Sequence, residues 1–229
     1  MQITENIHQV DGVNANVFLV IDGSELTAID SGMPRNAGNI LDYVHKIGRE
    51  PSDISRILLT HCHIDHVGSA HELKGLTNAK VAIHQDDAEY LAGTKTLPRP
   101  KGATGVLFKA VSPLFKFTPF QPDIVLREND KVGRLAVIHT PGHTPGSISL
   151  YEPEEKTLFV GDAIRFRDRK ITGPPERFTL DMNEAVQSIG KISQMDFDLM
   201  LSGHGEPLKP DASGKIREFL ASLKQRGGL

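Results

Sequence analysis

The stretch Thr60-His61-Cys62-His63-Ile64-Asp65-His66 places three histidines and one carboxylate within six consecutive residues. It follows an apolar segment, residues 54–60, whose composition is typical of a buried strand. Imidazole and carboxylate groups are the ligands that borderline divalent metals prefer in proteins. The stretch therefore predicts a metal site at the end of a strand.

Side-chain direction within this stretch indicates how the ligands would be shared. In an extended segment, residues two apart point the same way, so His61 and His63 can bind one ion together. A bend into a helix then turns Asp65 and His66 toward a neighbouring position. Cys62, the only cysteine, points to the opposite side, so we expect a buried, inert thiol and not a ligand.

Three later loops carry matching groups, each directly after an apolar strand-like segment. Two of them hold a histidine beside glycines, residues that permit a close approach of the backbone. The third holds an aspartate. The three candidate ligands are His143, Asp162 and His204. With the first stretch, the chain offers five histidines and two aspartates, enough for two ions with three private ligands each and one bridging carboxylate.

Composition limits the classes of function. The chain has 229 residues, 38% of them apolar and 24% charged, and a net charge of −3. These values predict one globular domain, residues 1–229, and no strong cationic field for nucleic acid or an anionic membrane. There is no secretory signal pattern and no apolar run of about 20 residues. We therefore expect a cytoplasmic protein with a small-molecule substrate, no nucleic-acid partner and no membrane partner.

The pattern of apolar residues predicts strands that alternate with helices. The helices expected are residues 40–47, 67–76, one beginning after Asp181, and 216–223. The expected strands are residues 17–21, 26–30, 54–60, 80–84, 124–126, 135–138, 148–151, 157–160 and 197–201. Strands, helix and ligand-rich loop thus occur twice, in a single integrated core.

Residues 94–123 interrupt this rhythm with prolines and aromatic residues. A connection of this length is uncommon unless it is a lid, a binding loop or an interface. We expect Phe108, Phe115 and Phe117 to form an apolar wall or the contact of a homodimer, or to pack onto the core. This insert and residues 165–178 are expected at the mouth of the site, where they would shape the substrate pocket. The charged run 165–170 itself is typical of a solvated face.

Taken together, these motifs resemble the metallo-β-lactamase fold superfamily. The resemblance rests on five segments that span nearly the whole chain: residues 28–32, 60–68, 140–146, 161–162 and 202–205. It implies an α/β (α+β) fold, a four-layer αββα sandwich of two mixed β-sheets flanked by helices. It also implies a site at one edge of the sheets.

The same resemblance implies the ligand set. It gives the first ion His61, His63 and His143, and the second ion Asp65, His66 and His204, with Asp162 bridging the two. By the same resemblance, Asp30 would support the ligand loops without binding metal. We expect zinc, with iron or manganese as alternatives. His139 is expected near the ligand loops or in the core, and the remaining histidines are expected to bind no metal.

Two adjacent divalent ions lower the pKa of a shared water, so the hydroxide can attack a carbonyl or phosphoryl centre. Asp65 is suited to orient that hydroxide and to handle its proton. The nearest resemblance is to glyoxalase-II-like hydrolases. The chain ends soon after His204, however, without the C-terminal helical region that grips glutathione. Hydrolysis of an ester, thioester or lactone is therefore the leading hypothesis, ahead of β-lactam, phosphodiester or transfer-RNA cleavage.

Two alternatives stay open at this point. A mononuclear Fe(II) dioxygenase of the persulfide-oxidising type resembles the same fold and would use His61, His143 and Asp162. A non-catalytic binding module that holds metal is the third hypothesis. Metal identity separates the first two, since iron near one per chain favours the dioxygenase and two zinc-like ions favour hydrolysis.

Overall fold

The computed structural model describes residues 1–98 and 117–225. Contacts between residues group the chain into two compact units, Met1–Leu126 and Arg127–Leu229. Each unit has its own sheet, its own helices and its own share of the predicted ligands.

Unit 1 is built on a six-stranded mixed sheet in which sequence order and spatial order agree. The first three strands form antiparallel hairpins, and the strands from β3 to β6 run parallel to one another. Gly23, at φ 60°, closes the β2–β3 hairpin. The strands are β1 (Ile7–Gln9), β2 (Phe18–Asp22), β3 (Glu25–Ile29), β4 (Ile54–Leu58), β5 (Lys80–His84) and β6 (Ile124–Leu126).

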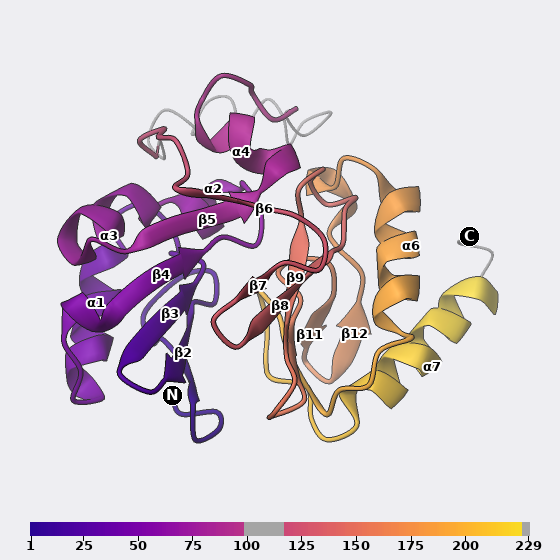
Figure 1. The fold of residues 1–229 in the computed structure, drawn as a ribbon. Coiled ribbons are helices and arrows are strands. Elements are labelled where there is room, and N and C mark those ends of the chain that lie inside the picture. The colour runs from indigo at the N-terminus through magenta and orange to yellow at the C-terminus, as the bar shows by residue number, and fades with distance from the viewer. Residues whose placement is uncertain (99–116, 226–229) are drawn as a thin grey trace. The chain divides into compact units, whose positions relative to one another are not determined.

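The helices of unit 1 follow the parallel strands, as crossover connections require. Helices α1 and α3 lie beside the sheet in Figure 1, and α4 follows the end of β5. The apolar stripe of α1, with Ile40 and Val44, joins Leu73 of α3 and the strand residues in one buried cluster. The helices are α1 (Ala37–Lys46), η1 (Pro51–Asp53), α2 (Ile64–Val67), α3 (Ala70–Thr77) and α4 (Gln85–Leu91).

Unit 2 contains a five-stranded mixed sheet in the order β13-β10-β9-β8-β7. Strands β10 and β13 are parallel, and the other neighbours are antiparallel. A separate hairpin, β11–β12, follows β10. The strands are β7 (Lys131–Val132), β8 (Leu135–His139), β9 (Ile148–Glu152), β10 (Thr157–Phe159), β11 (Arg165–Arg167), β12 (Lys170–Thr172) and β13 (Leu199–Leu201).

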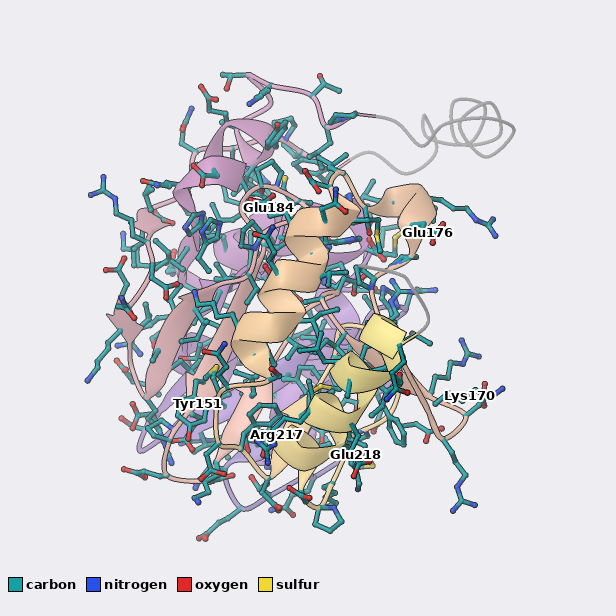
Figure 2. All side chains as sticks on the ribbon, turned by 90° about the vertical axis from the view of Figure 1, so that its right-hand side faces the viewer. Tyr151, Lys170, Glu176, Glu184, Arg217 and Glu218 are labelled. Atoms are coloured by element: carbon teal, nitrogen blue, oxygen red, sulfur yellow. The ribbon has the colours of Figure 1, made fainter. Side chains whose placement is uncertain are left out.

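Two helices cover this second sheet: α6 (Met182–Ile192) and α7 (Ala212–Gln225), with the short η3 (Glu176–Phe178) before α6. Figure 2 shows them side by side, with Glu184 on α6 and Arg217 on α7. Asp181 caps α6 by accepting a hydrogen bond from the Glu184 amide at 2.9 Å, as its sequence position predicts. Ile189 of α6 and Ile216 of α7 share one buried cluster with the strands.

Most predicted elements are confirmed, and a few boundaries are corrected. The helix predicted over 67–76 is α3, which begins at Ala70, and the bend into a helix expected at Asp65 and His66 is α2. The last strand begins at Leu199 and not at residue 197. Helix α4 and the β11–β12 hairpin were not predicted, because neither shows a long periodic pattern. The run 165–170 is thus an ordered hairpin, although residues 167–170 are exposed as expected.

The proline-rich insert lies only partly within the described residues. Phe117 and Phe120 pack against the buried cluster of unit 1, which agrees with the expectation that aromatic residues of the insert pack onto the core. Phe108 and Phe115, for which an apolar wall or a dimer contact is predicted, lie outside the described residues. Among the helices described, none is long and apolar enough to cross a membrane.

Candidate metal centre

Strand direction brings the predicted ligands of unit 1 together. Strands β3 and β4 are parallel neighbours, so their carboxyl ends lie at the same edge of the sheet. Asp30 follows β3, and the Thr60–His66 stretch follows β4. We call His61, His63, Asp65 and His66 the unit 1 cluster. Its rings are in contact, with His61 centred 4.9 Å from His63 and 4.0 Å from His66.

Asp30 forms hydrogen bonds with two residues of the Thr60–His66 stretch. Its buried carboxylate accepts hydrogen bonds from the Thr60 amide at 2.7 Å and from the Thr60 hydroxyl at 2.8 Å. It also contacts Nδ1 of His66 at 2.8 Å. A carboxylate only accepts, so Nδ1 of His66 carries the proton and Nε2 is the nitrogen able to bind a cation. Asp30 thus contacts two residues of the ligand stretch, and its role in supporting metal ligands stays a prediction.

His61 is held in the same tautomer by a threonine. The hydroxyl of Thr60 has a single hydrogen, which it donates to Asp30. Its contact with Nδ1 of His61, at 3.0 Å, must therefore be one in which the imidazole donates. His61 is 1% exposed, and its Nε2 lone pair is the one suited to a metal.

His63 and Asp65 form the more accessible part of the unit 1 cluster. His63 precedes α2, and Asp65 lies in the first turn of this helix. The Asp65 side chain is 32% exposed, and its carboxylate lies 3.9 Å from Nε2 of His66. A carboxylate in that position can bind a cation beside His66 and still be reached from solvent.

Strand direction also explains the cluster in unit 2. Strands β10 and β13 are parallel, and β8 runs the same way because β9 is antiparallel to both β8 and β10. The three carboxyl ends therefore share one edge, where the chain places His143, Asp162 and His204, here called the unit 2 cluster. Nε2 of His143 lies 3.6 Å and Nε2 of His204 lies 3.7 Å from the Asp162 carboxylate.

A second threonine orients His143. Thr179, between η3 and α6, donates its hydroxyl hydrogen to the Pro175 carbonyl at 2.9 Å. Its contact with Nδ1 of His143, at 3.1 Å, is then accepted from the imidazole. Nε2 of His143 consequently faces Asp162 with its lone pair. The arrangement repeats that of Thr60 and His61, on an unrelated segment.

Two glycines let the ligand loops of unit 2 approach their neighbours. Gly142 has φ 121°, and a Cβ there would lie 2.2 Å from the amide nitrogen of Ala185. Gly205 also has φ 121°, and a Cβ there would lie 2.1 Å from the carbonyl oxygen of Phe166. Any other residue would therefore both strain the backbone and clash. This confirms the close approach predicted from the glycines flanking these histidines.

The positively charged side chain of Arg165 contacts the unit 2 cluster. The guanidinium of Arg165, at the start of β11, donates a hydrogen bond to Oδ2 of Asp162. The Asp162 side chain is almost fully buried, whereas that of Arg165 is 28% exposed. Arg165 is predicted both at the mouth of the site and within a solvated charged run, and its contact with a predicted ligand corrects the second of these assignments.

Two residues predicted to bind no metal, Cys62 and His139, contact protein groups. Cys62 is buried, and its amide donates to Asp87 at 2.7 Å. Burial, with a smaller contribution from the Asp87 charge, raises the pKa of the Cys62 thiol, which keeps it protonated. His139 contacts the Pro145 carbonyl of the adjacent ligand loop at 2.8 Å.

Sequence reasoning missed three residues that touch predicted ligands: Thr60 as an orienting group, Thr179 and Arg165. The hydroxyl of Thr60, directly before His61, is a signal that the sequence displays. Thr179 lies 36 residues from His143, and nothing in the sequence pattern links the two.

The two clusters offer imidazole nitrogens and carboxylate oxygens and no thiolate, a donor set that suits zinc, iron or manganese. Three of the imidazoles have Nδ1 bound by protein groups, as is typical of histidines that bind a metal through Nε2. The residues thus fit a divalent metal.

Comparison with known proteins agrees with this chemistry. Residues 10–204 match the family model of the Metallo-beta-lactamase superfamily. "Probable metallo-hydrolase YflN" of Bacillus subtilis (strain 168) is 30% identical, over 98% of this chain and 92% of that protein. "Acyl-coenzyme A thioesterase MBLAC2" of Bos taurus is 28% identical, over 67% of this chain and 59% of that protein.

Among solved structures, the metallo-beta-lactamase family protein TTHA1429 from Thermus thermophilus superposes with a TM-score of 0.77 at 21% identity. The match covers 98% of this chain and 81% of that one. Likeness at this level of identity shows the fold, and it confirms the predicted fold class. The family model and the hydrolase relatives confirm the predicted family and enzyme class: the chain is a hydrolase of the metallo-beta-lactamase superfamily.

Proposed function

We propose that this protein is a dinuclear metal-dependent hydrolase that cleaves a thioester, ester or lactone of a small molecule. Seven side chains would hold two divalent ions, for which zinc is the metal we expect: His61, His63, Asp65, His66, His143, Asp162 and His204. Asp162 is the proposed bridging ligand, and Asp30 is proposed to support the ligands without binding metal.

The observation that carries the proposal is the orientation of the imidazoles. Thr60, Asp30 and Thr179 each contact Nδ1 of a different histidine, so that the Nε2 atoms of His61, His66 and His143 carry lone pairs. Such oriented, buried imidazoles beside carboxylates have a clear use in metal binding. A surface loop that is merely rich in histidine would show no comparable order.

Two bound divalent ions would supply a hydroxide nucleophile at neutral pH and polarise the carbonyl of the substrate. Within the protein, Asp65 is the proposed group that orients the nucleophile and receives its proton. Its position at the first turn of α2 and its partial exposure support this role. The buried Asp162 is suited instead to a fixed ligand role.

Thioesters stand first among the substrates because of one relative. MBLAC2 is named an acyl-coenzyme A thioesterase, and it aligns with two thirds of this chain. An acyl thioester has a good leaving group, so a hydroxide nucleophile and a polarised carbonyl suffice without a serine or cysteine nucleophile. The protein's single cysteine is buried and protonated.

The test combines metal analysis with a substrate panel. The native protein is purified without oxygen, its metals are quantified, and it is assayed against acyl thioesters, aryl esters, lactones, a phosphodiester and a persulfide. We expect two zinc-like ions per chain and turnover of a thioester or ester. Asp65→Asn should lower kcat by about 100-fold or more, whereas His45→Ala, an exposed histidine on α1, should leave it unchanged.

Three outcomes would contradict all or part of the proposal. One iron per chain with oxygen uptake on a persulfide would establish the dioxygenase chemistry instead. Fully metallated protein that hydrolyses no member of the panel would leave only a binding role. Turnover of the phosphodiester alone would keep the metal site and overturn the substrate class.

A further inference from the structure

Arg165 has a position that neither the fold nor the proposed ligand set requires. Its guanidinium donates to Oδ2 of Asp162, the carboxylate oxygen that also faces Nε2 of His143. The positive charge of Arg165 thus lies beside Asp162, the carboxylate that is proposed to bind metal ions. An arrangement that opposes metal binding in this way needs a reason other than metal binding itself.

The backbone of β11 fixes the place of this side chain. The Phe166 carbonyl accepts the Glu206 amide at 2.7 Å, and Phe166 forms a bridge with Gly205, next to His204. Phe166 packs with its partner strand into the buried cluster under α7. Side chains alternate along a strand, so Arg165 and Arg167 are on the opposite face of β11 from Phe166.

Only the first of these two arginines reaches the unit 2 cluster. Arg167 is 80% exposed and lies near Asp168 at the turn of the hairpin. Figure 2 shows Lys170, which pairs with Arg167 across the hairpin, pointing away from the helices. Arg165 and Arg167 therefore share a strand, a face and a charge, and differ in their contact with Asp162.

The hydrogen bonding of Arg165 argues against a purely structural role. Within residues 1–98 and 117–225, its Nε atom is buried and has no hydrogen-bond partner. An arginine that joins two segments for structural reasons normally forms hydrogen bonds with all of its buried N–H groups. In Arg165 the buried Nε takes no part in such bonding among the described residues, and the Nη2 contact with Asp162 is what joins the side chain to the unit 2 cluster.

We propose that Arg165 is a positioning residue that orients the Asp162 carboxylate and, through its charge, limits how tightly the protein binds divalent metal. This inference rests on the proposed function, because it concerns the same ligand. A carboxylate has enough lone pairs to accept from a guanidinium and to bind a cation at once. The guanidinium and a metal ion bound to the same carboxylate would repel each other, and this repulsion would lower the affinity for the metal.

The experiment measures zinc affinity and needs no turnover. Chelator-stripped protein is titrated with zinc against a chromophoric chelator, for the wild type and three variants. Arg165→Gln keeps a donor and removes the charge, and we expect it to bind zinc at least about tenfold more tightly. Arg165→Lys keeps the charge, and Arg167→Gln removes the neighbouring exposed charge. Both should remain within about threefold of the wild type.

Tighter binding is a result that damage to the fold cannot produce, since a distorted ligand would weaken binding. An unchanged or weaker zinc affinity in Arg165→Gln would overturn the inference and leave the proposed hydrolase intact. So would an equal gain in Arg167→Gln, because a general charge effect would explain it. Wild-type protein that binds no zinc would overturn the proposed function, and this inference with it. If Arg165→Gln does not fold, Arg165→Met, similar in length and uncharged, takes its place.

Discussion

Asp30 accepts a hydrogen bond from Nδ1 of His66 at 2.8 Å while it also holds the amide and hydroxyl of Thr60. Asp30→Asn should therefore disturb His66 and, through Thr60, His61. The backbone of Asp30 has φ 62°, a region that asparagine tolerates, so the substitution spares the backbone and replaces one accepting oxygen by an NH2 group that only donates. We expect zinc affinity to fall by about 10- to 100-fold, measured by chelator competition.

The matched control for this prediction is Asp42→Asn, on the exposed side of α1. It removes the same charge from the same unit and should leave zinc affinity unchanged. If Asp30→Asn binds zinc as the wild type does, the supporting role of Asp30 is wrong.

Thr179 provides a test of imidazole orientation in unit 2. Thr179→Val keeps the shape of the side chain and removes the hydroxyl that accepts from Nδ1 of His143. The ring then loses its preference for the tautomer that presents the Nε2 lone pair. We expect zinc affinity about tenfold lower and recovery to near the wild-type value in Thr179→Ser. Equal loss in both variants would indicate a packing effect.

Asp162 should link metal content to activity. It lies within 4 Å of both histidines of the unit 2 cluster, and we propose that it bridges two ions. Asp162→Ala should lower metal content and hydrolysis together, as measured on the same preparation by elemental analysis and by assay. Full activity with unchanged metal stoichiometry would remove the bridging role.

Gly205 should be sensitive to the addition of a single methyl group. Its φ is 121°, and a Cβ at this position would come within 2.1 Å of the Phe166 carbonyl oxygen, which leaves no room for a side chain. Gly205→Ala should lower the free energy of unfolding by about 2–4 kcal/mol. Gly190→Ala, in α6 with open space around it, should raise it by about 0.5–1 kcal/mol. Chemical denaturation measures both.

Burial of Cys62 predicts a dependence on pH. The folded protein raises the pKa of this thiol above its ordinary value of 9.0. The neutral thiol is therefore favoured by folding, and its contribution to stability is complete below pH 9 and declines as the pH rises above it. Stability curves of the wild type should fall more steeply above this pH than those of Cys62→Ala. Native protein should also resist thiol reagents at about pH 8 until it is unfolded.

The fold could be predicted largely because each ligand motif follows a strand. The His61 stretch after β4 and the His204 loop after β13 are local patterns that sequence displays directly. Alternation along the extended segment also predicted, correctly, that Cys62 is buried.

The parts that could not be predicted depend on residues distant in sequence. Thr179 acts on His143 across 36 residues, and a threonine before a short helix has no distinguishing pattern. Arg165 looked like one charge in a solvated run, because only the hairpin turns it toward Asp162 while Arg167 stays exposed. Helix α4 is 7 residues long, too short for a periodic signal.

The shared edge formed by β8, β10 and β13 offers a way to check whether the strands of a purified protein are correctly paired. A slip of one residue in the pairing of β10 with β13 would turn the β13 side chains to the opposite face and shift the following loop, with His204, relative to Asp162, while many backbone hydrogen bonds would remain. Spectroscopic measures of secondary structure would scarcely register such an error. Uptake of a metal ion would register it at once, so cation binding can serve as an assay of correct strand alignment in any variant or preparation.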